Sequence, residues 1–254
     1  MEASTRPSVD LLILGVLWLA GNVLAAITAV VISGIAGWDL QAISGEGADV
    51  GRASIQIASG GTVVDEVVPI WGTALFQVPL WGALVAAPIV VARGWTAMLE
   101  RYRVTHRWRD APAGAGAGLL TQLLLLPMLY WVLFSLFGDA DVGRPARELA
   151  ARVDGTFGTV VFVVFVAVVA PIAEELAFRG VLLRSLERLM APGWALVVSA
   201  GLFAAVHFQF LQFPGLFVFG LVAGALAQRR NGLVAPIAAH MAFNATAAFS
   251  VLTS

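Results

Sequence analysis

The sequence predicts an all-α fold, a polytopic bundle of about seven transmembrane helices, and three observations support this class. First, 59% of the 254 residues are hydrophobic and only 12% are charged, whereas soluble domains contain about 45 to 50% apolar residues. Second, the mean hydropathy is +0.88, and the apolar residues gather in runs of bilayer length. Third, no segment between these runs is long enough for a separate soluble domain. We therefore expect a single integral membrane domain over residues 1–254.

Each apolar run is interpreted as one helix, because a helix needs about 20 residues to cross the roughly 30 Å of hydrocarbon in a bilayer. The first run is longer than the core of a signal peptide and has no basic leader, since Glu2, Arg6 and Asp10 nearly cancel. We expect it to be a retained helix. The predicted spans, of which the sixth is short, are 11–35, 67–92, 113–137, 157 to about 189, 194–210, 216–227 and 233–252.

All fifteen basic residues are arginine, and their positions predict the orientation of the bundle. Because cytoplasmic loops are enriched in basic residues, the turns after the second, fourth and sixth spans should be cytoplasmic and the N-terminus inside. Segment 37–66 then becomes an external loop, in which 54–67 around Gly60 and Gly61 predicts a small hairpin. The exclusive use of arginine is typical of a high-GC bacterial genome and indicates the bacterial cytoplasmic membrane. The arginines of the cytoplasmic turns are Arg93, Arg101, Arg103, Arg107, Arg109, Arg184, Arg188, Arg229 and Arg230.

Composition also excludes several kinds of function. The chain has no cysteine, which excludes disulfides, thiolate metal sites and a cysteine nucleophile. Its net charge is -1, so the sequence gives no reason to expect nucleic acid as a partner. The partner that the composition does indicate is the lipid bilayer.

The first candidate cluster is Glu174, Glu175 and Arg179 in the fourth span. A charge at the centre of a membrane helix costs roughly 2.5 to 3.5 kcal/mol, and the apolar stretch 160–169 recovers only about 3 to 6 kcal/mol. The charges should therefore face protein or water, which indicates a functional site. Residues four apart share a helix face, so Glu175 and Arg179 should pair, while Glu174 lies about 100° around and is expected to be unpaired. A structural ion pair beside a snorkelling acid is the alternative interpretation.

The second cluster is Phe203 and His207 in the fifth span, and its depth matches that of Glu174. The two spans should be antiparallel around a turn near residues 191–192. Glu174 lies 17 residues before Ala191 and His207 lies 15 after Pro192, which places both roughly 22 to 26 Å from the turn. We expect the two groups to meet. The alternative is a core histidine with no catalytic part.

The third cluster is His240 and Asn244, four residues apart in the seventh span. Counted from Gly232, they should lie roughly 12 to 18 Å deep, at a somewhat shallower level. Polar contacts that join membrane helices are the alternative interpretation, and these contribute about 0.6 to 2 kcal/mol each. Two further features are structural: Pro171 predicts a kink before the acidic pair, and small residues at 220 and 224 predict close packing of the sixth span.

At these three clusters the chain resembles the CPBP family of intramembrane proteases, which includes the type II CAAX prenyl proteases and bacterial Abi-type and bacteriocin-processing proteins. Its motifs are two glutamates with an arginine four beyond the second, a phenylalanine four before a histidine, and a histidine four before an asparagine. Their order and spacing agree with this chain over roughly residues 171–246. We therefore expect a protease-like catalytic core at 156–252 within the membrane domain.

The resemblance implies a peptide bond hydrolysed in a membrane cavity that opens to the cytoplasm. The substrate would be a membrane-associated peptide or protein, either prenylated or bacteriocin-like. The resemblance also implies that Glu174 and His207 activate the attacking water, and that His240 and Asn244 stabilise the oxyanion. The residues implied to support this site are Glu175, Arg179 and Phe203.

The resemblance leaves the metal open, because the family is often described as metalloproteases. Glu174, His207 and His240 could in principle hold zinc with an open fourth position. We favour chemistry without a cofactor, because the chain has no HExxH pair on one helix and Asn244 beside His240 suits an oxyanion better than zinc. Two other functions remain open: a scaffold or immunity protein without hydrolysis, and a proton-coupled transporter, since intramembrane acids and histidines also form relays.

Overall fold

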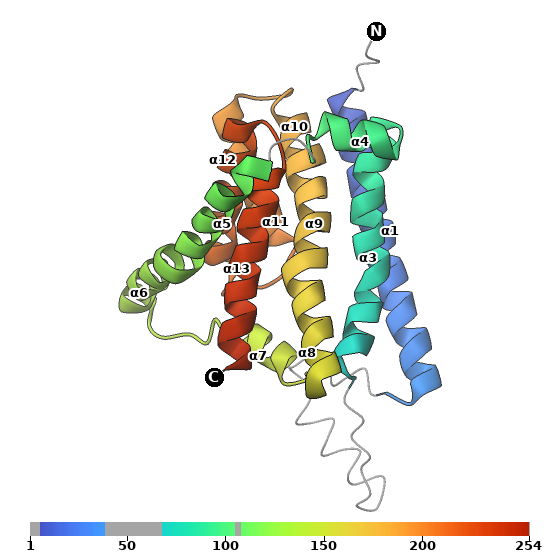
Figure 1. Ribbon diagram of the computed structural model, residues 1–254, viewed down its shortest axis with the longest axis vertical. Helices are drawn as coiled ribbons and strands as arrows, with labels where there is room; N and C mark the ends of the chain where they lie inside the picture. Colours follow the sequence, from blue (N-terminus) through green and yellow to red (C-terminus); the bar gives the residue numbers. More distant parts are fainter. Residues whose placement is uncertain (1–5, 39–67, 105–107, 254) are drawn as a thin grey trace, which may run out of the picture.

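The protein is a bundle of helices that run roughly along one long axis, as the computed structural model shows (Figure 1). The structure describes residues 6–38, 68–104 and 108–253, and it contains no strand within these ranges. The predicted all-α fold is therefore confirmed. The predicted hairpin at 54–67, nearly all of the predicted external loop and Arg107 lie outside the described residues.

The seven predicted spans each fall on helical segments. Five segments are long and apolar enough to cross a membrane, namely 7–36, 70–92, 108–137, 155–186 and 234–252. Helix 192–205 is shorter, so a multi-pass bundle is confirmed while the count of seven remains a prediction. In chain order the elements are α1 (Pro7–Ala36), α3 (Ile70–Ala92), α4 (Trp95–Arg101), η2 (Trp108–Asp110), α5 (Ala111–Leu120), η3 (Thr121–Leu125), α6 (Leu126–Phe137), α7 (Arg144–Ala150), α8 (Gly155–Val164), η4 (Phe165–Val169), α9 (Ala170–Glu175), η5 (Leu176–Leu182), α10 (Leu183–Leu186), α11 (Pro192–Ala205), α12 (Phe213–Arg230) and α13 (Val234–Leu252).

The fifth predicted span is wrong at its end, and the error concerns His207. The apolar run suggested a helix to residue 210, but α11 stops at Ala205 and turns follow to residue 212. Phe208 has φ 54°, a left-handed conformation that non-glycine residues rarely adopt, so the chain reverses here. With 14 residues, α11 is about 21 Å long. His207 therefore lies just beyond a short helix, in the turn that leads to α12.

Glycines permit two close helix contacts that set the positions of α12 and α13. A Cβ atom on Gly114 or Gly118 of α5 would lie 2.1 Å from Ala235 O or 2.0 Å from Ala239 O of α13. No side chain fits there, so the two backbones touch directly beside His240. The close packing predicted for residues 220 and 224 is also confirmed, since a Cβ atom at either position would lie within 3.0 Å of α11.

The N-terminal helix is joined to the rest of the bundle by buried Asp10. Its side chain is 1% exposed and forms ion pairs with Arg188 and, at 3.7 Å, with Arg101. Tyr102 is buried in the same cluster, and burial raises its pKa to about 12. These contacts join α1 and α4 to the end of α10 at one end of the bundle, while the C-terminus lies at the other end (Figure 1). That this arginine-rich end faces the cytoplasm remains a prediction.

Asp10→Ala should destabilise the protein by about 1 to 3 kcal/mol, because two arginines lose their buried partner but are exposed enough to regain water. The measurement is the midpoint of thermal unfolding in detergent. Asp139→Ala is the matched control, since it removes the same charge from an exposed position. Equal midpoints for the two variants would show that the Asp10 ion pairs contribute nothing to stability.

Candidate functional site

A buried ion pair forms the centre of the site. Arg179 Nη1 donates a hydrogen bond of 2.8 Å to Glu175 Oε1, and the two side chains are 1% and 0% exposed. Both residues lie on the helical run 155–186, one turn apart, so the pairing predicted from their spacing is confirmed. Two charges at this depth need further partners, because the desolvation of each costs several kcal/mol.

Those further partners come from α11 and α12. The Arg179 guanidinium lies over the ring of Phe203, with its Cζ 4.3 Å from the ring centroid, and 5.9 Å from that of Phe219. Its Nη2 also donates to Gly220 O at 3.4 Å. A cation over an aromatic face is attracted by the ring quadrupole. The role of Phe203 is thus to receive a buried cation, which explains why its side chain is fully buried.

His240 of α13 completes the cluster and contacts both acids. Its Nδ1 lies 2.8 Å from Glu175 Oε1, and its Nε2 lies 3.8 Å from Glu174 Oε2. Phe219 packs against the imidazole with a centroid distance of 4.6 Å. The expectation that Glu174 is unpaired was therefore wrong. Sequence spacing could not reveal this partner, because it lies 66 residues further along the chain and on a different helix.

The hydrogen bonds of Glu175 define the tautomer of His240. Glu175 Oε1 accepts from Arg179 and forms an ion pair with it, so the nearby Nδ1 of His240 is assigned as the donor of the second hydrogen bond to this oxygen. The Nε2 of His240 then faces Glu174. Glu175 Oε2 is buried without a hydrogen-bond partner among the described residues.

The two acids differ in access. Glu175 is completely buried, whereas the side chain of Glu174 is 18% exposed. Neighbouring residues on a helix point about 100° apart, which allows one to face the core and the other to face an opening. Glu174 is therefore the more accessible of the two acids.

His207 reaches this cluster through Phe203. Its Nδ1 lies 2.7 Å from Phe203 O, and its ring centroid lies 4.9 Å from that of Phe203. The Phe203 ring also contacts His240, at 5.8 Å. A carbonyl oxygen can only accept, so Nδ1 of His207 carries the hydrogen and Nε2 has the lone pair in the neutral form. The direct meeting of His207 and Glu174 stays a prediction.

Asn244 lies one turn beyond His240 and joins α13 to the helix that carries the acids. Its Nδ2 donates to Val166 O at 2.8 Å. Val166 belongs to the π-helical turn η4, which comes just before Pro171. The helix continues through Pro171, so the kink predicted there takes the form of a π turn whose freed carbonyl binds a side chain. An asparagine amide has a second N–H, so Asn244 keeps a donor for another partner.

The level predicted for the third cluster was wrong, and the reason is geometric. His240 was placed shallower than the acids by counting from Gly232, yet it contacts Glu174 and Glu175 directly. Counting residues from two different turns gives comparable depths only if the turns lie at one level. The turn before α13 must therefore lie deeper than the turn that follows α10.

The described residues contain no preformed zinc site, and the preference for chemistry without a cofactor stays a prediction. Over 6–38, 68–104 and 108–253, no group of three or more His, Cys, Asp or Glu side chains is arranged to hold a metal ion. The Nδ1 atoms of His240 and His207 are hydrogen-bonded to Glu175 and to a backbone carbonyl, respectively, so Nε2 is the ring nitrogen that each histidine could offer to a metal.

All three motifs lie within one segment of the chain that is similar to a known family. Residues 156–246 match the family described as type II CAAX prenyl endopeptidase Rce1-like. This confirms the resemblance predicted from the motifs, and the five helices long and apolar enough to cross a membrane support a multi-pass membrane protein. The matched segment is less than half of the chain. Neither a curated protein nor a solved structure matches the chain.

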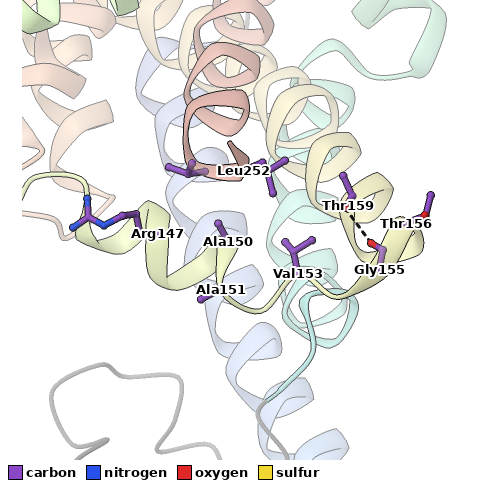
Figure 2. A pocket seen from close by; sticks show the side chains of 9 residues that line it. Arg147, Ala150, Ala151, Val153, Gly155, Thr156, Thr159 and Leu252 are labelled. Carbon is purple, nitrogen blue, oxygen red and sulfur yellow. Dashed lines mark hydrogen bonds between the residues drawn. The ribbon is translucent and has the colours of Figure 1, made fainter. Parts of the chain in front are cut away.

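A separate cavity of about 780 Å³ lies far from this cluster, between α7, the start of α8 and the end of α13 (Figure 2). It contains none of the predicted site residues. This cavity is therefore not the predicted pocket around Glu174. Its lining residues are Arg147, Ala150, Ala151, Val153, Gly155, Thr156, Thr159, Val251 and Leu252.

Arg179→Ala should lower the free energy of unfolding by about 3 to 5 kcal/mol, because it leaves Glu175 buried without its cation. Arg179→Lys should recover only part of this loss, since an ammonium cannot bond to Glu175 and Gly220 and also stack on Phe203. The measurement is thermal unfolding in detergent. Arg229→Ala, which removes an exposed arginine, should leave the midpoint nearly unchanged, and an equal loss in that control would contradict the interpretation.

Proposed function

We propose that this protein is an intramembrane endopeptidase that hydrolyses a peptide bond of a membrane-associated substrate, with Glu174 as the general base. The observation that carries the proposal is the linked set Glu174, His240, Glu175 and Arg179. It lies inside the segment that matches an endopeptidase family. A structural ion pair would need only Glu175 and Arg179. The partly exposed acid beside an oriented imidazole is the feature that structural stability leaves unexplained.

Glu174 is proposed to take the proton from the attacking water. Its side chain is the accessible one of the two acids, and a positioned general base contributes about 10² to 10⁴ in rate. The water oxygen attacks the carbonyl carbon of the peptide bond, forming a C–O bond, while the water proton passes to Glu174.

His240 is proposed to donate a hydrogen bond from Nε2 to the oxyanion that forms. Glu175 holds the hydrogen on Nδ1, so Nε2 is the ring nitrogen that is directed away from Glu175, and it donates to the oxyanion when it carries a second proton. One oxyanion donor typically contributes about 2.7 to 4 kcal/mol. Asn244, one turn away on the same helix, would supply a second donor from its remaining N–H. These contacts support the oxyanion role that the resemblance implied for both residues.

His207 is proposed to help Glu174 activate the attacking water. Its ring contacts Phe203, whose ring also contacts His240. Its Nδ1–H is held by Phe203 O, so the Nε2 lone pair is available to accept a proton. In the second half of the reaction the C–N bond breaks, and the proton taken from water is transferred to the leaving amine. The second proton of water, which is on the new carboxyl group, also passes to the amine. The products are therefore a carboxylate and an ammonium group, and the site returns to its initial protonation.

The proposed substrate is a C-terminal peptide with a prenyl group, the class that the description of the matched family names. A bacteriocin-like peptide is the alternative. Both are membrane-associated, so the bilayer would bring the scissile bond to a site on transmembrane helices. The proposed location is the bacterial cytoplasmic membrane, with the arginine-rich end in the cytoplasm.

Glu174→Gln should reduce cleavage by about 10³-fold, and His207→Ala and His240→Ala by about 10²- to 10³-fold. The measurement is the cleavage of a farnesylated peptide with a C-terminal CAAX sequence in proteoliposomes. Membrane peptides from cells with wild-type protein and with Glu174→Gln are compared as well, so that a different substrate class is also detected.

Glu187→Gln is the matched control, because the side chain of Glu187 is also 18% exposed but pairs with Arg184 outside the cluster. It should cleave at the wild-type rate. Full activity in Glu174→Gln would end the proposed mechanism. An unchanged set of membrane peptides, together with partner binding that survives Glu174→Gln, would favour the scaffold or immunity function instead.

A further inference from the structure

Helix α6 stands apart from the rest of the bundle. The run 108–137 packs closely on α13 through α5, but beyond the π turn η3 and Pro127 it diverges from the other helices (Figure 1). None of the residues of α6 is buried. A helix that buries so little of its surface gains little stability from packing. Its few hydrogen bonds to the rest of the bundle therefore indicate its role.

The most specific of these contacts is made by the hydroxyl of Tyr130. Its Oη donates to Leu211 O at 3.1 Å and accepts from the backbone N–H of Gly215 at 3.3 Å. A Cβ atom at Gly215 would lie 2.8 Å from this oxygen, so the absence of a side chain there permits the approach. Both hydrogen-bonding functions of the hydroxyl are thus used on the junction between the turn 206–212 and α12.

A second anchor holds the same turn. Gln212 Nε2 donates to Val142 O at 2.9 Å, and Val142 lies in the connection that follows α6. Two hydrogen bonds therefore connect the turn 206–212 to the segment 130–142. That segment lies outside the part of the chain that matches the endopeptidase family.

The turn needs such anchors because it packs poorly by itself. Phe208 and Phe210 are 82% and 91% exposed, and the left-handed backbone at Phe208 is an unfavourable conformation for a bulky residue. His207 lies within this turn, directly before Phe208. The hydrogen bond of its Nδ1 to Phe203 O orients the ring, but the position of its backbone depends on where the turn is held.

We propose that Tyr130 is a positioning residue for His207. Through its hydrogen bonds to Leu211 and Gly215, the hydroxyl fixes the position of the turn 206–212 relative to Glu174 and His240. This inference rests on the proposed function, since it concerns the placement of a histidine that is proposed to activate water. The inference gives α6 a part in catalysis, although this helix lies outside the segment that matches the endopeptidase family.

The test is Tyr130→Phe, which removes only the hydroxyl. With the farnesylated CAAX peptide in proteoliposomes, kcat should fall about tenfold with KM unchanged within about twofold, because displaced catalytic groups slow the chemical step more than they weaken binding. Gln212→Ala should act in the same direction. Ser135→Ala is the matched control on α6, since its hydroxyl donates a hydrogen bond to Val132 O of its own helix, and kcat should not change.

A second measurement does not depend on cleavage. The chain contains three histidines, so NMR spectra of isotope-labelled imidazoles can be assigned by their loss in His207→Ala and His240→Ala. In Tyr130→Phe the His207 signals should shift or broaden, while those of His240 stay in place. A merely structural contact would lower the unfolding midpoint without this selective change.

Unchanged His207 signals together with wild-type kcat in Tyr130→Phe would overturn the inference, as would equal disturbance of both histidines. These outcomes are distinguishable from failure of the proposed function. If Glu174→Gln or His207→Ala still cleaves, the mechanism is wrong, whereas a selective shift of His207 would still show that Tyr130 positions it.

Discussion

The burial of the Arg179 guanidinium among transmembrane helices is the constraint on which the rest of the structure depends. A charge removed from water at this depth is tolerated only when several partners surround it. Glu175, the Phe203 ring and Gly220 O supply those partners from three helical elements. Satisfying one cation therefore brings α9 and η5, α11 and α12 together. The same carboxylate oxygen that binds Arg179 also binds His240, which adds α13 and orients the imidazole.

Glu174 and Glu175 are adjacent in the chain, but their environments differ in burial and in hydrogen-bond partners. Glu175 is fully buried and accepts from two donors, so it acts as an orienting group. Glu174 is partly exposed and faces His240 Nε2 without a short hydrogen bond, which suits the role of general base proposed for it. Separation of roles between two nearby carboxylates is common at hydrolytic sites. Here it follows from helix geometry, because successive side chains point about 100° apart.

The helices outside the matched segment contribute to the site rather than only anchoring the protein. The glycines of α5 allow α13 to approach until the backbones touch next to His240. Tyr130 of α6 and Val142 beyond it hold the turn that carries His207. Asp10 of α1 joins the far end of the helix that carries both acids. His207 and His240 are thus positioned partly by residues that lie outside the three motifs.

The sequence by itself determined the helical runs, the three polar motifs and the contact between Glu175 and Arg179. These are local properties: hydrophobic length and the spacing of residues one turn apart report only what lies within one helix. The tertiary structure alone decided that His240 bridges both acids, that α11 ends at Ala205, and that Tyr130 holds the turn of His207. Such contacts depend on the relative level and tilt of helices. Those are set by close packing at glycines and by the need to compensate buried charge, and no pattern within a single helix encodes them.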